Sequence, residues 1–224
     1  MGAEPRPRAA GLPYREWDYP SGPPEYLNIP DLELSGPAFF NIVRSRRSRP
    51  PSAPLSDASL GTLLWYTGKT WERTPPSEGR WEHRGAPSAG GRHPIDIFVA
   101  SRTGAPGALY RYDPLGHSLV LLPFPTCEVA DLLNSAGAAA RTHAGTVLFF
   151  AAQVGRTRAR YENPETLIWR DAGALTATVA LVAEAIGAAC TPLGMTGEPY
   201  ISRLLSSGGE VTGVGGCVVG TAQG

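Results

Sequence analysis

The sequence has few of the residues that bind metals or form disulfides. Its 224 residues include three cysteines, four histidines and two methionines. Cys127, Cys190 and Cys217 form no CxxC pair, and no two histidines have the spacing HxxxH or HExxH. We therefore expect no metal site and no disulfide scaffold, and we interpret each cysteine as a buried packing residue of a protein in a reducing cytoplasm.

The sequence also has no net charge and no long uninterrupted apolar run. Lys and Arg number 20, as do Asp and Glu, which argues against nucleic-acid binding through a basic surface. The longest apolar tract, residues 172–189, is rich in Ala and is interrupted by Glu184, so it predicts a buried helix rather than a membrane span. The first residues lack the apolar stretch of a secretory signal. We expect a cytoplasmic protein with no membrane partner.

Several common signatures of catalysis are absent too. The sequence contains no P-loop pattern, no glycine-rich dinucleotide pattern after a strand and no nucleophile elbow of the serine hydrolases. These absences remove support for the commonest nucleotide-binding and hydrolase classes. The length suits one domain, or one domain with an extension.

Proline is concentrated at the N-terminus. Seven prolines in residues 1–35 preclude long helices and central strands there, yet the same segment carries Tyr14, Trp17, Tyr19 and Tyr26. We expect an extended arm lying on a protein surface, either this subunit's or a partner's; the alternative is a frayed tail. The chain is thus divided into residues 1–35, a Pro-rich N-terminal arm, and residues 36–224, the folded domain.

The hydrophobic pattern after the arm predicts a mixture of helices and hairpins. We expect helices at residues 37–44, 56–68 with Ser56 as the N-cap, 127–140, 169–189 and 200–205. We expect strands at residues 94–101, 108–112, 118–122, 145–152 and 214–219, and a polar loop at 69–92. Consecutive hairpins without regular βαβ alternation indicate the α+β class.

Three basic or glycine-rich segments could carry chemistry. Residues 44–49, RSRRSR, hold four arginines whose planar donors suit a phosphate; the alternative is a solvated helix end. Residues 84–94, RGAPSAGGRHP, would let backbone N–H groups approach a flat ligand, or would form a flexible loop. Residues 156–161, RTRARY, end in Tyr161, which could exchange a proton; the alternative is a surface arginine stripe.

Taken in order, five segments resemble the nitroreductase-like flavoproteins. VRSRRSRPPSAPLSDASLGTLLWYTG is similar to their opening, and RGAPSAGGRHPIDIFVASR is similar to their SagB-type, azoline-dehydrogenase branch. ALYRYDPLGHSLVLL resembles the hairpin that follows there, LIWRDAGALTATVALVAEAIGAACTPLG the long central helix with the segment after it, and GVGGCVVG the closing strand. The resemblance covers roughly residues 40–220.

The resemblance implies an α+β, nitroreductase-like fold with a central antiparallel sheet flanked by helices. It implies an intertwined homodimer with one FMN at each subunit interface. Arg46, Arg47 and Ser48 would hold the phosphate and ribityl end. The other predicted cofactor contacts are Pro87, Ser88, Ala89 and Gly90, reaching over from the other subunit, and Leu193, Gly194 and Met195, lying against the isoalloxazine.

SagB-type members oxidise thiazoline and oxazoline rings of a precursor peptide to thiazoles and oxazoles. The resemblance therefore implies an azoline-containing peptide as substrate and a cyclodehydratase as partner. Where that branch often carries Lys-Tyr, this sequence has Arg160-Tyr161, and because arginine keeps its proton Tyr161 would be the base, supported by Arg160. Two alternatives stand: a non-catalytic scaffold subunit of a peptide-modifying synthetase, and a generic NAD(P)H-dependent nitro- or quinone reductase.

Overall fold

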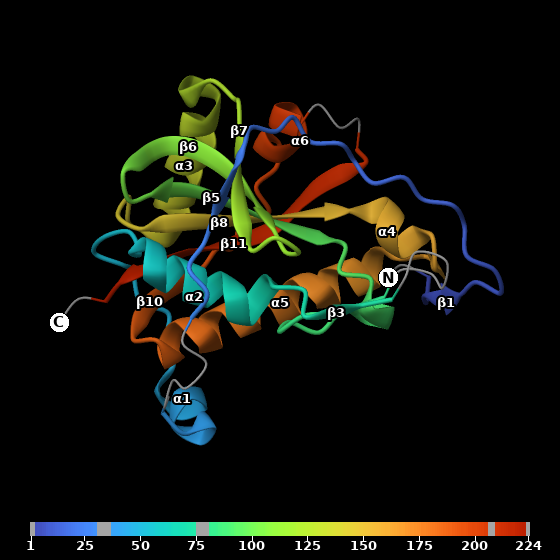
Figure 1. The fold of residues 1–224 in the computed structure, drawn as a ribbon, viewed down its shortest axis with the longest axis horizontal. Coiled ribbons are helices and arrows are strands. Elements are labelled where there is room, and N and C mark those ends of the chain that lie inside the picture. Colours follow the sequence, from blue (N-terminus) through green and yellow to red (C-terminus); the bar gives the residue numbers. More distant parts are fainter. Residues whose placement is uncertain (1–2, 31–36, 75–80, 206–208, 223–224) are drawn as a thin grey trace.

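The computed structural model describes residues 3–30, 37–74, 81–205 and 209–222. The expected boundary between arm and domain, at residues 35 and 36, lies outside these ranges. Within them the central feature is a seven-stranded antiparallel sheet (Figure 1), whose strands are ordered β10-β11-β8-β5-β6-β7-β2. These strands are β2 (Pro24–Tyr26), β5 (Ile95–Arg102), β6 (Ala105–Asp113), β7 (Ser118–Leu122), β8 (Thr146–Gln153), β10 (Ala188–Pro192) and β11 (Val211–Thr221).

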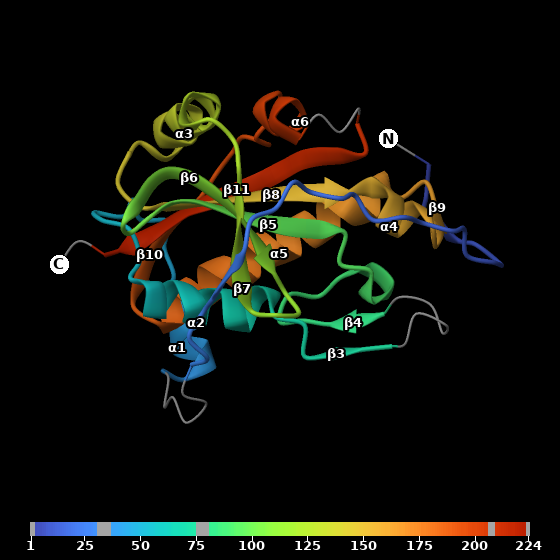
Figure 2. The same cartoon turned by 45° about the horizontal axis from the view of Figure 1, so that its top comes forward.

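Helices cover both faces of this sheet. Helices α2 (Asp57–Gly68) and α5 (Glu165–Ala185) lie on one face, and α3 (Thr126–Ala140) and α6 (Tyr200–Leu205) lie on the other (Figure 2). Successive side chains of a strand point to opposite faces, so Phe150 of β8 packs in the core beside α2 and α5 and Phe149 packs in the core beside α3 and α6. The expected α+β architecture with an antiparallel sheet flanked by helices is confirmed.

Helix α2 forms as its sequence predicts. The Ser56 hydroxyl accepts a hydrogen bond from the Ser59 N–H at 3.1 Å, satisfying one free donor of the first turn. Leu60, Leu63 and Leu64 are fully buried. Helix α1 (Phe39–Ser45) differs, because it projects from the body of the molecule (Figure 1) and has no buried residue.

Two expected elements differ in extent. Helix α5 begins at Glu165 and ends at Ala185 rather than running to residue 189, because Gly187 turns the chain with a φ of +71° and Ala188–Pro192 then pairs with β11. Residues 69–92 are more ordered than a loop: β3 (Glu72–Arg73) pairs with β4 (Glu82–His83), and a 3-10 turn, η2, spans Ala89–Gly91.

Helix α5 is the one described helix that is long and apolar enough to cross a membrane, by length and composition. Eight of its residues are buried, and the helix lies against α2 and the sheet (Figure 2). It is therefore the central core helix of this fold.

The cysteines do not all pack as expected. Cys190 and Cys217 are buried on the neighbouring strands β10 and β11, whereas Cys127 is exposed at the start of α3. A hydrogen bond with Cys190 and burial raise the pKa of the Cys217 thiol well above its ordinary value. Cys217 is thus held protonated in the core.

The N-terminal arm lies along the surface of its own chain. Strand β2 pairs with β7 at one edge of the sheet. Farther toward the N-terminus, β1 (Arg6–Pro7) pairs with β9 (Tyr161–Glu162). Between these two strands Tyr19 is buried and donates its hydroxyl proton to Asp96 at 2.8 Å. Tyr19 therefore anchors the arm to the domain.

Candidate functional site

A groove with a volume of about 620 Å³ runs along the exposed face of α5. Its lining includes the small α5 residues Ala172, Gly173, Thr176 and Ala177. Their short side chains leave the groove open, and larger side chains at these positions would fill it. Pro192, Leu193, Val214 and Gly215 form one wall, and Arg46 lies at the rim. Two of the predicted cofactor residues, Arg46 and Leu193, thus share one groove.

In the basic cluster at the end of α1, one residue lines the groove and the others do not. The Arg47 guanidinium donates to the carbonyl oxygens of Arg44 and Arg46 at 2.8 and 2.9 Å, so it stabilises the helix end, as the alternative interpretation held. Arg49 forms an ion pair with Glu184 at 2.9 Å. Ser48 is exposed. Arg46 is the member that reaches the groove.

The three predicted cofactor residues after β10, Leu193, Gly194 and Met195, have different surroundings. The Leu193 N–H donates to the Gly216 carbonyl oxygen at 2.9 Å, which fixes Leu193 at the groove wall. Gly194 is exposed. Met195 packs against the hydrophobic core on the α3 and α6 face, and it is not among the described lining residues of the groove. Leu193 packs against the same core, so the contact of Met195 with a flavin stays a prediction.

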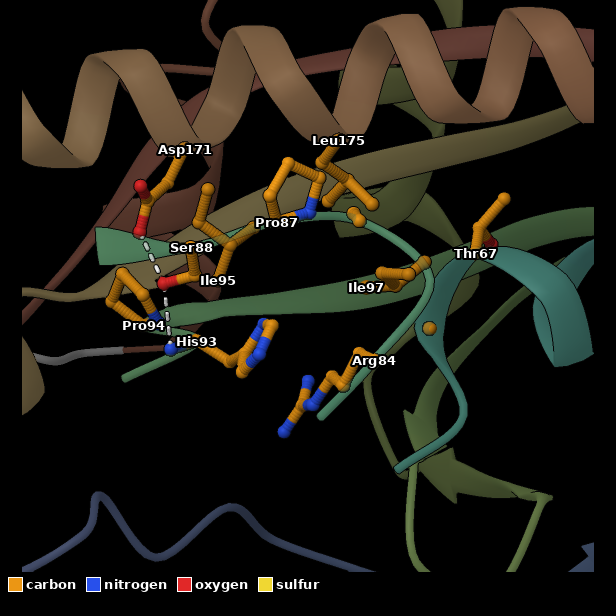
Figure 3. A pocket seen from close by; sticks show the side chains of 12 residues that line it. Thr67, Arg84, Pro87, Ser88, His93, Pro94, Ile95, Ile97, Asp171 and Leu175 are labelled. Atoms are coloured by element: carbon orange, nitrogen blue, oxygen red, sulfur yellow. Dashed lines mark hydrogen bonds between the residues drawn. The ribbon is translucent and has the colours of Figure 1, made fainter. Parts of the chain in front are cut away.

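The loop at residues 87–90 is held by a carboxylate that the sequence analysis did not identify. Asp171 of α5 accepts a hydrogen bond from the Ala89 N–H at 3.0 Å. Asp171 also accepts from the Ser88 hydroxyl at 2.5 Å, and Ser88 in turn accepts from the His93 N–H at 2.9 Å (Figure 3). Pro87 and Ser88 line a cavity of about 20 Å³ beside Asp171, enough for one water. The Ser88 hydroxyl and the Ala89 N–H are therefore engaged within the protein.

Burial raises the pKa of Asp171, and the hydrogen bonds from Ser88 and Ala89 oppose that rise. A buried carboxylate on a core helix needs such donors. Its sequence signal was an acidic residue at an otherwise apolar position of a helix, in the segment WRDAG. Asp171 is thus a positioning residue for the loop at 87–90.

Gly90 and Tyr161 are in direct contact. Gly90 and Gly91 have φ values of +60° and +59°, a region that glycine enters without strain. A Cβ on Gly90 would lie 2.6 Å from the Tyr161 hydroxyl oxygen. The fold therefore brings together two residues predicted from separate motifs, one in the glycine-rich loop and one in RTRARY.

Two cationic side chains lie near Tyr161. Burial and the charge of Arg160 lower the pKa of Arg92, while Tyr161 raises it. The Arg92 Nε is buried and has no hydrogen-bond partner among the described residues. Arg160 donates from Nη1 to the Arg8 carbonyl oxygen of the arm at 2.8 Å. Positive charge at this position stabilises negative charge developing on a phenolic oxygen.

The interpretation of residues 156–160 as a surface stripe is wrong for Arg156. This residue is buried in α4 (Val154–Arg158) and donates to Asp96 Oδ1 at 2.8 Å. Burial by itself would raise the pKa of Asp96, but Arg156, with hydrogen bonds from Gln153 and Tyr19, lowers it below its ordinary value. The network fixes the turn from β8 into α4, and that turn leads to Tyr161.

In a single chain the predicted residues form two groups on different sides of α5. Ala172 and Thr176 face the groove that Arg46 and Leu193 line. Asp171 and Leu175 face the cavity that Pro87 and Ser88 line. Tyr161 belongs with the second group through Gly90.

Solved structures share this fold. A putative nitroreductase from Ralstonia eutropha is 23% identical with a TM-score of 0.69, over 99% of this chain and 100% of that one. The E. coli microcin synthetase McbBCD complex with truncated pro-MccB17 bound is similar at 18% identity and a TM-score of 0.60, over 89% and 79% of the chains. A putative nitroreductase from Desulfovibrio desulfuricans in complex with FMN is 17% identical with a TM-score of 0.54, over 84% and 88%.

No curated protein matches the sequence significantly. The model of the nitroreductase family matches residues 44–221, from the basic cluster to the last strand of the sheet. These residues include the groove, the glycine-rich loop and Tyr161. The chain belongs to the nitroreductase family.

Proposed function

We propose that this chain is an FMN-dependent dehydrogenase that oxidises azoline rings of a peptide to azoles. The observation that carries the flavin part is the groove along α5. Its lining combines small residues of α5 with one arginine. The small residues allow a flat aromatic ring to approach the helix, and the arginine suits a phosphate tail. The groove's volume of about 620 Å³ is typical of cofactor sites.

A second copy of the chain would complete this site. Phe39, Phe40 and Trp169 are exposed by 62%, 82% and 53%, and the first two lie on the projecting helix α1. Such exposed aromatic side chains are typical of surfaces that bind a partner. Placed in a homodimer, the group of residues 87–90 and Tyr161 of one subunit would face the groove of the other.

Within that arrangement Arg46 would bind the phosphate and Leu193 would pack against the ring system. FMN, when bound, supplies the two-electron acceptor for substrate oxidation. Tyr161 would accept the proton from the azoline ring carbon, with the charges of Arg92 and Arg160 stabilising its oxygen. Asp171 would hold the loop at 87–90 in place through Ser88 and Ala89.

The azoline substrate is supported by the SagB-like segment RGAPSAGGRHP and by the fold shared with the microcin synthetase complex, which was solved with truncated pro-MccB17 bound. An azoline becomes an azole by losing two electrons and two protons. Tyr161 would take one of those protons, and the other would leave together with both electrons, as hydride, to the acceptor that FMN supplies when bound. A cyclodehydratase would supply the azoline, since it makes that ring from Cys, Ser or Thr.

The test is an FMN titration followed by turnover of an azoline peptide. We expect about one FMN per subunit and a mass loss of two hydrogens per ring. FMN binding with turnover only on NADPH and a quinone would identify a generic reductase instead. A protein that binds no FMN would identify a non-catalytic subunit.

A further inference from the structure

The segment at residues 158–163, here called the ledge, binds main chain of the N-terminal arm. The Ala159 and Arg160 carbonyl oxygens each accept an arm N–H at 2.8 Å, from Leu12 and Arg8. In the other direction Arg160 Nη1 donates to the Arg8 carbonyl oxygen at 2.8 Å. The Arg8 side chain adds hydrogen bonds to the Arg158 carbonyl oxygen at 3.0 Å and to Glu162 at 3.3 Å. The contacts made by backbone atoms of the arm are ones that any extended peptide can offer.

The register places Pro7 opposite Tyr161 and Arg6 opposite Glu162. Residues opposite each other in an antiparallel pair project their side chains on the same face, with Cβ atoms about 4.5–5.5 Å apart. The arm thus sets a five-membered ring, the pyrrolidine of Pro7, beside the residue assigned as the base.

The prolines also match the hydrogen-bond pattern. The Arg8 N–H points to the ledge, so the backbone nitrogen of Pro7 points away from it. Proline has no N–H, and none is needed on that side. The alternation Pro5-Arg6-Pro7-Arg8 therefore suits one register of this strand pair.

An azoline residue shares both properties of Pro7. Its backbone nitrogen belongs to a five-membered ring and carries no hydrogen. It differs in that the residue before it has lost its carbonyl oxygen. The donor and acceptor that contact Arg160 belong to the residue after the ring, Arg8 in the arm, and a substrate peptide keeps both.

We propose that the ledge binds the extended main chain of the azoline peptide substrate, and that the arm segment at residues 4–12 is a resident pseudosubstrate with Pro7 in the place of the azoline ring. The inference rests on the proposed function. The substrate ring then lies opposite Tyr161, and the arm competes with the substrate for the ledge.

The first part of the arm is held less firmly than the second, so a substrate peptide can replace the first part on the ledge. No residue from 3 to 12 is buried. Tyr19, in contrast, is buried and bonded to Asp96, and Tyr14 and Trp17 both bond to Gln153. Residues 4–12 can leave the ledge while residues 14–19 stay in place.

The test is a binding measurement that needs no flavin. A variant lacking residues 2–12 is titrated into a fluorescently labelled peptide of residues 3–13. We expect saturable anisotropy, displacement by an azoline peptide, and at least tenfold weaker binding to the full-length chain. In the matched control peptide Pro5 and Pro7 are each moved one position toward the C-terminus, and Pro13 is kept. This removes the N–H at residue 8, and we expect at least tenfold weaker binding.

A second variant guards against misfolding of the truncated chain. Arg8→Pro in the full-length protein removes the N–H that binds the Arg160 carbonyl oxygen and the side chain that contacts Arg158 and Glu162. It leaves the contacts of residues 14–19 intact. We expect it to bind the labelled peptide more tightly than the wild type does. Failure of both variants to bind the peptide, or equal binding of the control peptide, would overturn the inference. An azoline peptide that displaces the label but is not oxidised would support the ledge and refute the proposed function.

Discussion

The Tyr161 hydroxyl lies against Gly90, so near that a Cβ on Gly90 would meet its oxygen at 2.6 Å. The two residues are 71 positions apart in the sequence. Strand β9 carries one, and the turn η2 carries the other. The contact makes the glycine-rich loop a wall of the site around Tyr161, and four predictions follow from it and its surroundings.

Gly90→Ala should move Tyr161. Both Gly90 and Gly104 have positive φ, +60° and +77°, but a Cβ on Gly104 would meet nothing within 4 Å. Each change to Ala should cost about 1–2 kcal/mol of stability through backbone strain. Only Gly90→Ala should also lower azoline turnover, measured at saturating FMN. Equal turnover in the two variants would show that the contact is not needed.

Tyr161→Phe should remove the base and keep the cofactor. The proton transfer contributes about 10²–10⁴-fold to such reactions, so azoline oxidation should fall by that factor at unchanged FMN stoichiometry. Tyr26→Phe is the control, since Tyr26 is 77% exposed on β2. Wild-type turnover in Tyr161→Phe would reject the assignment of the base.

Arg46→Ala should weaken FMN binding more than Arg47→Ala. Arg46 lines the groove, whereas Arg47 donates to carbonyl oxygens at the end of α1. Loss of a charge-assisted bond to the phosphate costs about 1.5–3 kcal/mol, which isothermal titration would register as a higher Kd. The opposite ranking would mean that the two side chains exchange roles when FMN binds.

Asp96→Ala should destabilise the protein by about 3–5 kcal/mol, because it leaves Arg156 as a buried charge without its carboxylate. The folded-state pKa of Asp96 lies below its ordinary value of 3.8. The stabilisation is therefore fully present above pH 3.8 and is lost as the pH falls toward the folded-state pKa.

Thermal unfolding across this pH range gives the measurement. The stability difference between wild type and Asp96→Ala should shrink as the solution is acidified. Asp18→Asn is the control, since Asp18 is an exposed carboxylate of the N-terminal arm, and its effect should be small at every pH. A difference that stays constant down to pH 2 would contradict the ion-pair assignment.

Local signals predicted much of the fold. Helix α2 follows from a serine cap and leucines at helical spacing, and α6 was predicted with its observed limits, Tyr200–Leu205. Strand β10 was missed, because Ala188 and Ala189 continue the composition of α5, and pairing with β11 decided their conformation. Tertiary pairing overrides propensity in such a segment.

The candidate site was only partly predictable. The resemblance identified the glycine-rich loop and Tyr161 as separate motifs, but their contact depends on the path of the sheet. Asp171 and the pair Asp96–Arg156 were missed because a buried charge is recognised by its partner, and these partners lie far apart along the chain. The fold also divided the basic cluster, with Arg46 at the groove and Arg47 on the helix end.

The alternation of proline and arginine in the arm has a consequence for handling the protein. With the Pro7 nitrogen facing outward, the outer side of β1 lacks an N–H at that position, and a foreign strand would gain little by pairing there. Removing the arm exposes the ledge carbonyl oxygens as an open edge. Protein that lacks the arm should therefore self-associate at high concentration. Samples in which the arm has not been removed by proteolysis should self-associate least.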